Sequence, residues 1–215
     1  MKTSNAFSFS FFFLLALSAL FTGAEFIYDS DGDILNNGGA YYILPPGFGG
    51  EAIKGAAIER SPSCQLAVVA EISYDKGWAA NIRTPFPVKY ITNDYPLNIS
   101  FANLPSNDCT KTGDWVVIDL IGSEGEPIMA GKFEELKHAV SGYFYIKPYG
   151  STRFYKLAFC YSTASCGYVT LMNTHTTSNR LLTVSLDRSK EPLVFKFVKA
   201  TSSSGKVASG ISMVV

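Results

Sequence analysis

Short apolar runs separated by turn-forming residues recur along most of this 215-residue chain. The runs are rich in β-branched and aromatic side chains, and Gly, Pro, Asn, Asp or Ser bounds each of them, which is typical of strands joined by tight turns. We therefore predict strands at 41–44, 65–73, 87–91, 97–101, 114–120, 142–146, 154–160, 168–172, 181–186 and 193–199.

Only residues 131–139 (GKFEELKHA) have a helical pattern, and Gly131 and the short length make that helix marginal. Many short strands without intervening helices predict an all-β sandwich or barrel. A repeat of roughly 60 residues is hinted at, with divergent units.

The two ends of the chain do not follow the strand pattern. Lys2 and an apolar run at 11–21, followed by small residues, have the layout of a secretory signal peptide, so we predict that residues 1–24 are removed. The run is too short to span a bilayer comfortably, and no second transmembrane candidate follows. We expect one domain over residues 25–200 and a loose Ser/Gly-rich tail at 201–215.

The charge of the chain argues against two classes of partner. The sequence has 18 Lys and Arg and 18 Asp and Glu, and loss of Lys2 with the leader leaves 17 basic side chains. A nearly neutral protein without a basic run has no electrostatic footprint for nucleic acid and no polybasic segment for an anionic membrane.

Secretion makes the cysteines readable as disulfides rather than as metal ligands. All four, Cys64, Cys109, Cys160 and Cys166, lie after the leader. Four cysteines allow three pairings, of which the sequential one is the simplest, and the sequence alone does not choose between them. A glycosylation sequon begins at Asn98 and requires a surface position.

The run NIRTPFPVKYI at 81–91 differs from the other strand-like runs. Pro85 and Pro87 cannot donate hydrogen bonds to a strand ladder, so an interior strand is not expected here. Each proline also pushes the residue before it toward extended geometry. With Arg83 and Lys89 outside the prolines, the run predicts a stiff, extended loop with basic flanks.

The residues that follow the leader, IYDSDGDILNNGGAYYI (27–43), fix many residue types at fixed spacing. This segment resembles the signature of the plant Kunitz-type (soybean trypsin inhibitor-like) family. The strings CQLAVVA, DKG, PLNISF, DWVVI, FYKLAFC, CG, RLLTVS and PLVFKFVK follow in the family's order and approximate spacing. The resemblance therefore covers essentially residues 25–200.

The resemblance implies a fold and a pairing of the cysteines. The fold is a β-trefoil of twelve strands, in which three pseudo-repeats close a short barrel under a hairpin cap. The implied disulfides join Cys64 to Cys109 and Cys160 to Cys166. We expect a monomeric plant defence protein without a cofactor, secreted or alternatively stored in the vacuole.

The resemblance also implies an inhibitor that presents one rigid, substrate-like loop to a serine protease. Such a loop has lost its conformational entropy before binding, which favours affinity. An asparagine commonly braces the loop from inside, and counting through the signature places it at Asn37. The alternative interpretation is that the sequence NNGG (36–39) only forms a turn. Counting from DKG at 75–77 places the loop at Arg83, Thr84, Pro85, Phe86, Pro87, Val88 and Lys89.

Pro87 departs from the family at the position that sets specificity, where trypsin-directed members carry Arg or Lys. A proline ring cannot reach the acidic floor of a trypsin pocket, so trypsin is not the expected target. A shifted register could present Arg83 or Lys89 instead, or Phe86 could enter a chymotrypsin-like pocket, although a tertiary amide follows it. Another surface could inhibit a cysteine or aspartic protease, or the loop could be a stiff connector without inhibitory role.

A calcium site is not expected at the aspartates of the signature. Asp29, Asp31 and Asp33 alternate as in the start of an EF-hand loop. Ile34 and Ala40 stand where that loop needs Gly and Glu, so these acids are predicted to make turns and no metal is expected.

Three other functions have less support. His138 and His175 are the only histidines, and no nucleophile, zinc or paired-carboxylate motif accompanies them, so an enzyme is not expected. Trp78 and Trp115 are the only tryptophans, and the repeated Gln-x-Trp elements that would argue for a sugar-binding β-trefoil are absent. A storage or stress protein that keeps the fold without inhibition is favoured only by Pro87.

Overall fold

The computed structural model describes residues 23–46, 51–57, 65–73, 75–104, 112–120, 125–150, 153–173 and 179–200. These ranges contain twelve strands and one short 3-10 turn, η1 (Phe133–Glu135). The strands are β1 (Gly39–Leu44), β2 (Glu51–Ala57), β3 (Leu66–Ile72), β4 (Ala80–Arg83), β5 (Asn98–Phe101), β6 (Trp115–Val117), β7 (Glu126–Ala130), β8 (Tyr143–Pro148), β9 (Tyr155–Cys160), β10 (Cys166–Asn173), β11 (Arg180–Ser185) and β12 (Val194–Lys199).

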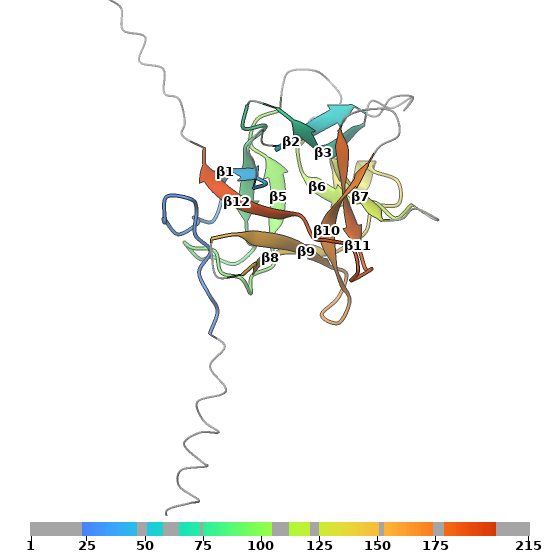
Figure 1. Ribbon diagram of the computed structural model, residues 1–215. Helices are drawn as coiled ribbons and strands as arrows, with labels where there is room; N and C mark the ends of the chain where they lie inside the picture. The colour runs from blue at the N-terminus through green and yellow to red at the C-terminus, as the bar shows by residue number, and fades with distance from the viewer. Residues whose placement is uncertain are drawn as a thin grey trace, which may run out of the picture.

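Six of the strands form a closed ring of antiparallel neighbours. Its order is β1, β4, β5, β8, β9 and β12, and β12 pairs with β1 to close the ring. Figure 1 shows β1 and β12, the first and last strands of the chain, side by side. Between β5 and β8 the ring is joined by an isolated bridge of Phe144 with Leu97, the residue just before β5. A closed ring leaves no free strand edge among its members.

The other six strands form three hairpins, β2–β3, β6–β7 and β10–β11. Strands β3, β7 and β11 also pair with one another, so the three hairpins meet as a cap on the barrel. This pattern, repeated three times along the chain, is the all-β, twelve-stranded β-trefoil that the resemblance implied.

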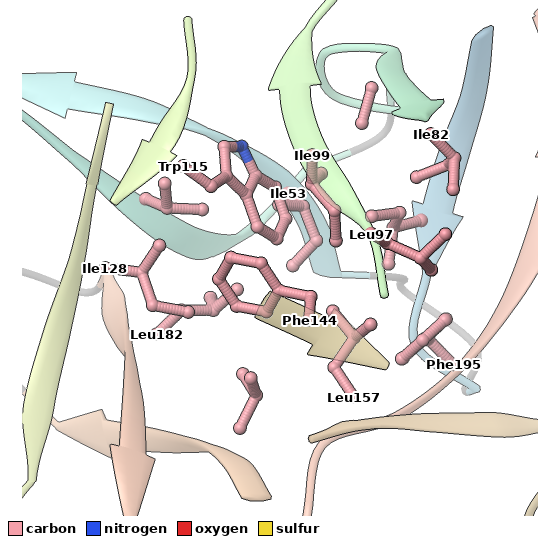
Figure 2. Packing of buried hydrophobic residues seen from close by; sticks show 14 of the residues in the cluster. Ile53, Ile82, Leu97, Ile99, Trp115, Ile128, Phe144, Leu157, Leu182 and Phe195 are labelled. Carbon is pink, nitrogen blue, oxygen red and sulfur yellow. The ribbon is translucent and has the colours of Figure 1, made fainter. Parts of the chain in front are cut away.

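Large apolar side chains from different strands fill the interior. Figure 2 shows Ile53, Ile99, Trp115 and Phe144 turned toward a common centre, and all four are buried. Phe144 makes edge-to-face contacts with Trp115 and Phe159, at ring-centroid distances of 6.2 and 5.0 Å. Such contacts add to the stabilisation that apolar burial provides.

Three strands were not predicted, namely β2, β4 and β7. The β2 sequence, EAIKGAA, is poor in β-branched residues, but all seven of its residues pair with β3. Strand propensity is overridden there by pairing and burial.

Two predicted elements are wrong. Residues 87–91 form no strand, and Tyr90 makes only an isolated bridge with Asn36. The predicted helix at 131–139 is limited to η1, because His138 adopts a φ of 62° and Ala139 then forms an isolated bridge with Ile118, the residue after β6.

Several predictions fall outside the described residues. These include the leader up to residue 22, the tail at 201–215, both members of the predicted Cys64–Cys109 disulfide, and His175. Within the described ranges, no helix has the length and hydrophobicity that would let it span a membrane.

The aspartates and tryptophans have structural contacts. The Oδ1 atom of Asp29 accepts the N–H groups of Asp31 and Asp33 at 3.0 and 2.9 Å, which is turn chemistry. Trp115 is buried in the core, and the half-buried Trp78 packs edge-on against Phe101 at 5.1 Å.

Candidate functional site

The predicted loop begins where β4 ends. Arg83 is the last residue of β4 and is opposite Asn98, the first residue of β5. Pro85, Phe86 and Pro87 are exposed beyond it. Two adjacent strands therefore hold the base of the loop, and its tip projects from the barrel.

The side chain of Asn37 contacts this loop from inside. Its Nδ2 donates to the carbonyl oxygens of Val88 at 3.0 Å, Phe86 at 3.2 Å and Thr84 at 3.5 Å. Its Oδ1 accepts the N–H of Thr84 at 2.9 Å. The backbone N–H of Asn37 donates to the carbonyl of Lys89 at 2.9 Å. One residue thus binds four residues of the loop, about 50 positions away along the chain.

Asn37 is positioned by the turn that precedes β1. The N–H of Gly38 donates to the carbonyl of Ile82 in β4 at 2.7 Å, and that of Gly39 donates to Asn36 at 3.0 Å. Gly38 has a φ of +79°, which favours glycine because it has no Cβ. The sequence NNGG therefore forms a turn, and this turn aims Asn37 at the loop.

Thr84 links the loop to the barrel. It is only 3% exposed, and its backbone N–H is the group that Asn37 Oδ1 accepts. Its hydroxyl oxygen also lies 3.5 Å from the N–H of Phe86. Because a buried N–H without an acceptor is costly, the Asn37 side chain also supports the packing of Thr84.

The tip of the loop is bent rather than fully extended. The N–H of Val88 donates to the carbonyl of Phe86 at 2.8 Å, which makes a three-residue turn centred on Pro87. The prediction of extended geometry throughout the loop is therefore wrong at this point. Among the described residues, no hydrogen bond reaches the carbonyls of Pro85 or Pro87, and both residues are exposed.

Aromatic contacts support the outer side of the loop. The Phe86 ring, although 46% exposed, packs edge-on against Tyr95 at 5.6 Å. The ammonium of Lys89 lies 4.9 Å from the centre of the Tyr90 ring. Tyr95 was missed by the sequence reasoning, because nothing in its sequence position indicates a contact with Phe86.

The other predicted site residues lie elsewhere on the molecule. Cys160 and Cys166 form a disulfide that closes the turn between β9 and β10, and Asn98 is exposed at the start of β5. His138 is exposed on the segment that pairs with β6. The structure therefore brings together Asn37 and residues 83–89, with Asn98 at the base of the loop.

Two tyrosines away from the loop have perturbed acidity. Burial raises the pKa of Tyr161, and so does the hydrogen bond that its hydroxyl donates to the Glu126 carboxylate at 2.5 Å. Burial also raises the pKa of Tyr155, although the N–H of Tyr28 donates to its hydroxyl oxygen and opposes the shift. Tyr155 thus fixes the segment around Tyr28 to the barrel, and Tyr161 fixes its turn to β7 of the cap, so neither forms part of the loop.

A family model described as legume Kunitz, trypsin and protease inhibitor, matches residues 27–199. Trypsin inhibitor B of Glycine max is 34% identical over 191 residues, covering 84% of this chain and 99% of that protein. Trypsin inhibitor A of the same species is 33% identical over 205 residues, covering 87% of this chain and 90% of that protein.

Solved structures give the same result. Soybean trypsin inhibitor in complex with porcine pancreatic trypsin superimposes with a TM-score of 0.71 at 30% identity, over 82% of this chain and 100% of that chain. Trypsin inhibitor 1 from Senna obtusifolia superimposes with a TM-score of 0.70 at 34% identity, over 90% of this chain and 100% of that one. With its β-trefoil fold, this chain thus belongs to the Kunitz (soybean trypsin inhibitor) family, whose members are protease inhibitors and not enzymes.

Proposed function

We propose that this protein inhibits a serine endopeptidase other than trypsin by presenting residues 84–89 to its active site. The observation that carries the proposal is the contact of one Asn37 amide with the carbonyls of Thr84, Phe86 and Val88. A loop ordered in this way before binding loses little further entropy when a protease engages it. If the loop is cut, the same contacts hold both new ends in place.

The hydrogen bonds favour one register of the loop in a protease. A serine protease needs an accessible carbonyl for its nucleophile and oxyanion hole. The carbonyls of Phe86, Val88 and Lys89 are already bonded to Asn37. Only the carbonyls of Pro85 and Pro87 are unpaired among the described residues of the loop. Of these two, we assign Pro87 to the specificity pocket, because the family signature counts to this position and Pro87 is the centre of the turn.

The same geometry argues against the alternative registers. The carbonyl of Lys89 accepts a hydrogen bond from the N–H of Asn37, and Arg83 lies within β4 opposite Asn98. Phe86 is exposed, but its carbonyl accepts from both Asn37 and Val88. The best target is therefore a protease whose pocket accepts a small apolar ring, and no observation favours a separate surface for cysteine or aspartic proteases.

The relatives suggest the matched test. Soybean trypsin inhibitor forms a complex with porcine pancreatic trypsin. We expect the purified protein to leave trypsin active and its Pro87→Arg variant to inhibit trypsin at least about 1000-fold more strongly. One side chain that fills a specificity pocket contributes on the order of 4 kcal/mol to binding. Titrations against trypsin, chymotrypsin, elastase, subtilisin and papain would measure this, with Phe86→Ala as the control variant.

Either of two results would overturn the proposal. A folded Pro87→Arg variant that remains inert toward trypsin would mean that the loop does not present residue 87. If the protein inhibits only papain, and neither Pro87→Arg nor Phe86→Ala changes that inhibition, the inhibitory site would be on another surface of the trefoil.

Four further expectations complete the proposed function. We infer that residues 1–24 direct the chain into the secretory pathway, from which it is exported or stored in the vacuole, and that 201–215 form a tail. We further propose that Cys64 and Cys109 form the second disulfide and that the mature protein is a monomer.

A further inference from the structure

The acceptor of the glycosylation sequon lies open on the surface. Asn98 is exposed, whereas the alternate residues Ile99 and Phe101 of the same strand point into the core. In the described part of the chain, its side-chain amide has no hydrogen-bond partner. The amide nitrogen is therefore accessible without any change in the fold.

A hollow of about 510 Å³ adjoins Asn98. Its walls come from β5, from β6, from the segment around η1 and from the start of β8. Two large rings stand in these walls, Phe133 at 44% and Tyr143 at 45% exposure. The charged side chains of the lining are Arg83, Asp114, Lys132 and Glu134.

This combination of groups fits a carbohydrate. Pyranose rings present C–H faces that pack on aromatic side chains and hydroxyl groups that hydrogen-bond to charged ones. Two exposed aromatic rings beside a hollow also form an apolar surface that a bound group would cover. A sugar tethered next to the hollow would be held there at high effective concentration.

We propose that Asn98 carries an N-linked glycan whose first sugars lie over this hollow against Tyr143 and Phe133. In the secretory pathway, the Asn98 Nδ2 atom attacks the anomeric carbon of a lipid-diphosphate-linked oligosaccharide. The C–N bond forms, the amide loses one proton and the lipid diphosphate leaves. The proposal depends on the predicted leader but not on the inhibitory role of the loop, so each can fail separately.

The position of the glycan follows from the strand register. Asn98 is directly opposite Arg83, so the glycan stands at the base of the loop rather than at its tip. It would extend from the outer face of β5 across the hollow toward β8, where Tyr143 is opposite Cys160. Binding of a protease to residues 84–89 and seating of the glycan therefore use different surfaces.

The first test is occupancy. The full chain would be produced in plant cells, and mass spectrometry would compare the peptide that contains residue 98 before and after treatment with a peptide:N-glycosidase. We expect a glycan mass on the native protein and on Ser100→Thr, and none on Asn98→Gln or Ser100→Ala. If the peptide that contains residue 98 is unmodified in the native protein, the proposal is overturned.

The second test distinguishes a seated glycan from one that projects into solvent. We expect deglycosylation to lower Tm by about 2–4 °C in the native protein. The loss should shrink to less than about 1 °C in Tyr143→Ala, because the contact is already gone. Tyr149→Ala is the matched control, since Tyr149 is 46% exposed but outside the hollow, and it should behave like the native protein.

Enzymatic removal leaves Asp at position 98, so an unglycosylated Asn98→Asp variant gives the reference Tm. An equal loss of Tm in Tyr143→Ala and the native protein would mean that the glycan is not seated on this wall. No loss in the native protein would mean the same, and either result would overturn the seating.

Discussion

Two exposed turns of this trefoil are held in different ways. The loop at 84–89 is held by the side chain of Asn37, which comes from a distant part of the chain. The turn at 161–165 is closed by the Cys160–Cys166 disulfide and by a hydrogen bond from Tyr161 N–H to the Ser165 carbonyl at 2.9 Å.

The two devices act on different states of the molecule. A disulfide mainly restricts the unfolded chain, and therefore stabilises the whole fold. The Asn37 amide acts in the native state, where it sets which carbonyls of the loop point inward. The comparison teaches that the disulfide contributes mainly to global stability, whereas the Asn37 side chain mainly sets the shape of the loop.

For these two turns, the largest expected effect is that of Asn37→Ala on inhibition. Loss of its hydrogen bonds to the loop should weaken binding to the target protease by about 2–4 kcal/mol, or about 30- to 900-fold in the inhibition constant. The loop should also be cleaved and released as an ordinary substrate. The measurement is the inhibition constant together with the rate of cleavage within residues 84–89.

Asn36→Ala is the matched control for this variant. Asn36 is the neighbouring asparagine, and its contacts with Gly39, Tyr41 and Tyr90 use backbone groups. Its removal should leave inhibition nearly unchanged. Equal inhibition and equal cleavage resistance in Asn37→Ala and Asn36→Ala would mean that the Asn37 amide does not brace the loop.

A smaller effect is expected from removing the disulfide with the double substitution Cys160→Ala and Cys166→Ala. For this short loop the chain-entropy model predicts a loss of about 2 kcal/mol in the free energy of unfolding. The inhibition constant should stay the same at temperatures where the variant is folded. Denaturant titration and protease inhibition measured on one sample would check both, and a parallel loss of inhibition would show that the two turns are coupled.

The smallest effect concerns the hydrogen bond that fixes the disulfide-closed turn to β7. The pKa of Tyr161 is raised in the folded protein, so its contribution to stability is present below the ordinary tyrosine pKa of about 10. Above that pH the unfolded tyrosine ionises while the folded one keeps its proton, and the contribution is lost. The free energy of unfolding should therefore fall more steeply above pH 10 in the native protein than in Tyr161→Phe.

Tyr149→Phe is the control for the alkaline series, since Tyr149 is 46% exposed. Its pH profile should follow that of the native protein. Native-like alkaline behaviour of Tyr161→Phe would show that the hydrogen bond to Glu126 has no influence on stability in this range.

Strands with strong patterns could be located from the sequence, and β9 (Tyr155–Cys160) and β12 (Val194–Lys199) are examples. In both strands the aromatic residues are buried, and β12 alternates its buried phenylalanines with less buried residues, so the signal is local. Strand β2 could not be found, because its alanines and glycine become a strand only through pairing with β3. The same holds for the ring of six strands, which depends on contacts between residues far apart in the sequence.

For the candidate site, the sequence by itself placed Asn37 and residues 83–89 through the spacing of a family signature, and prolines made the loop stiff. Only the tertiary structure decided which carbonyls of the loop Asn37 binds, that Pro87 is the centre of a turn, and that Tyr95 packs on Phe86. The physical reason is that residue type and spacing constrain local backbone geometry, whereas hydrogen bonds across about 50 residues exist only after β1, β4 and β5 have paired.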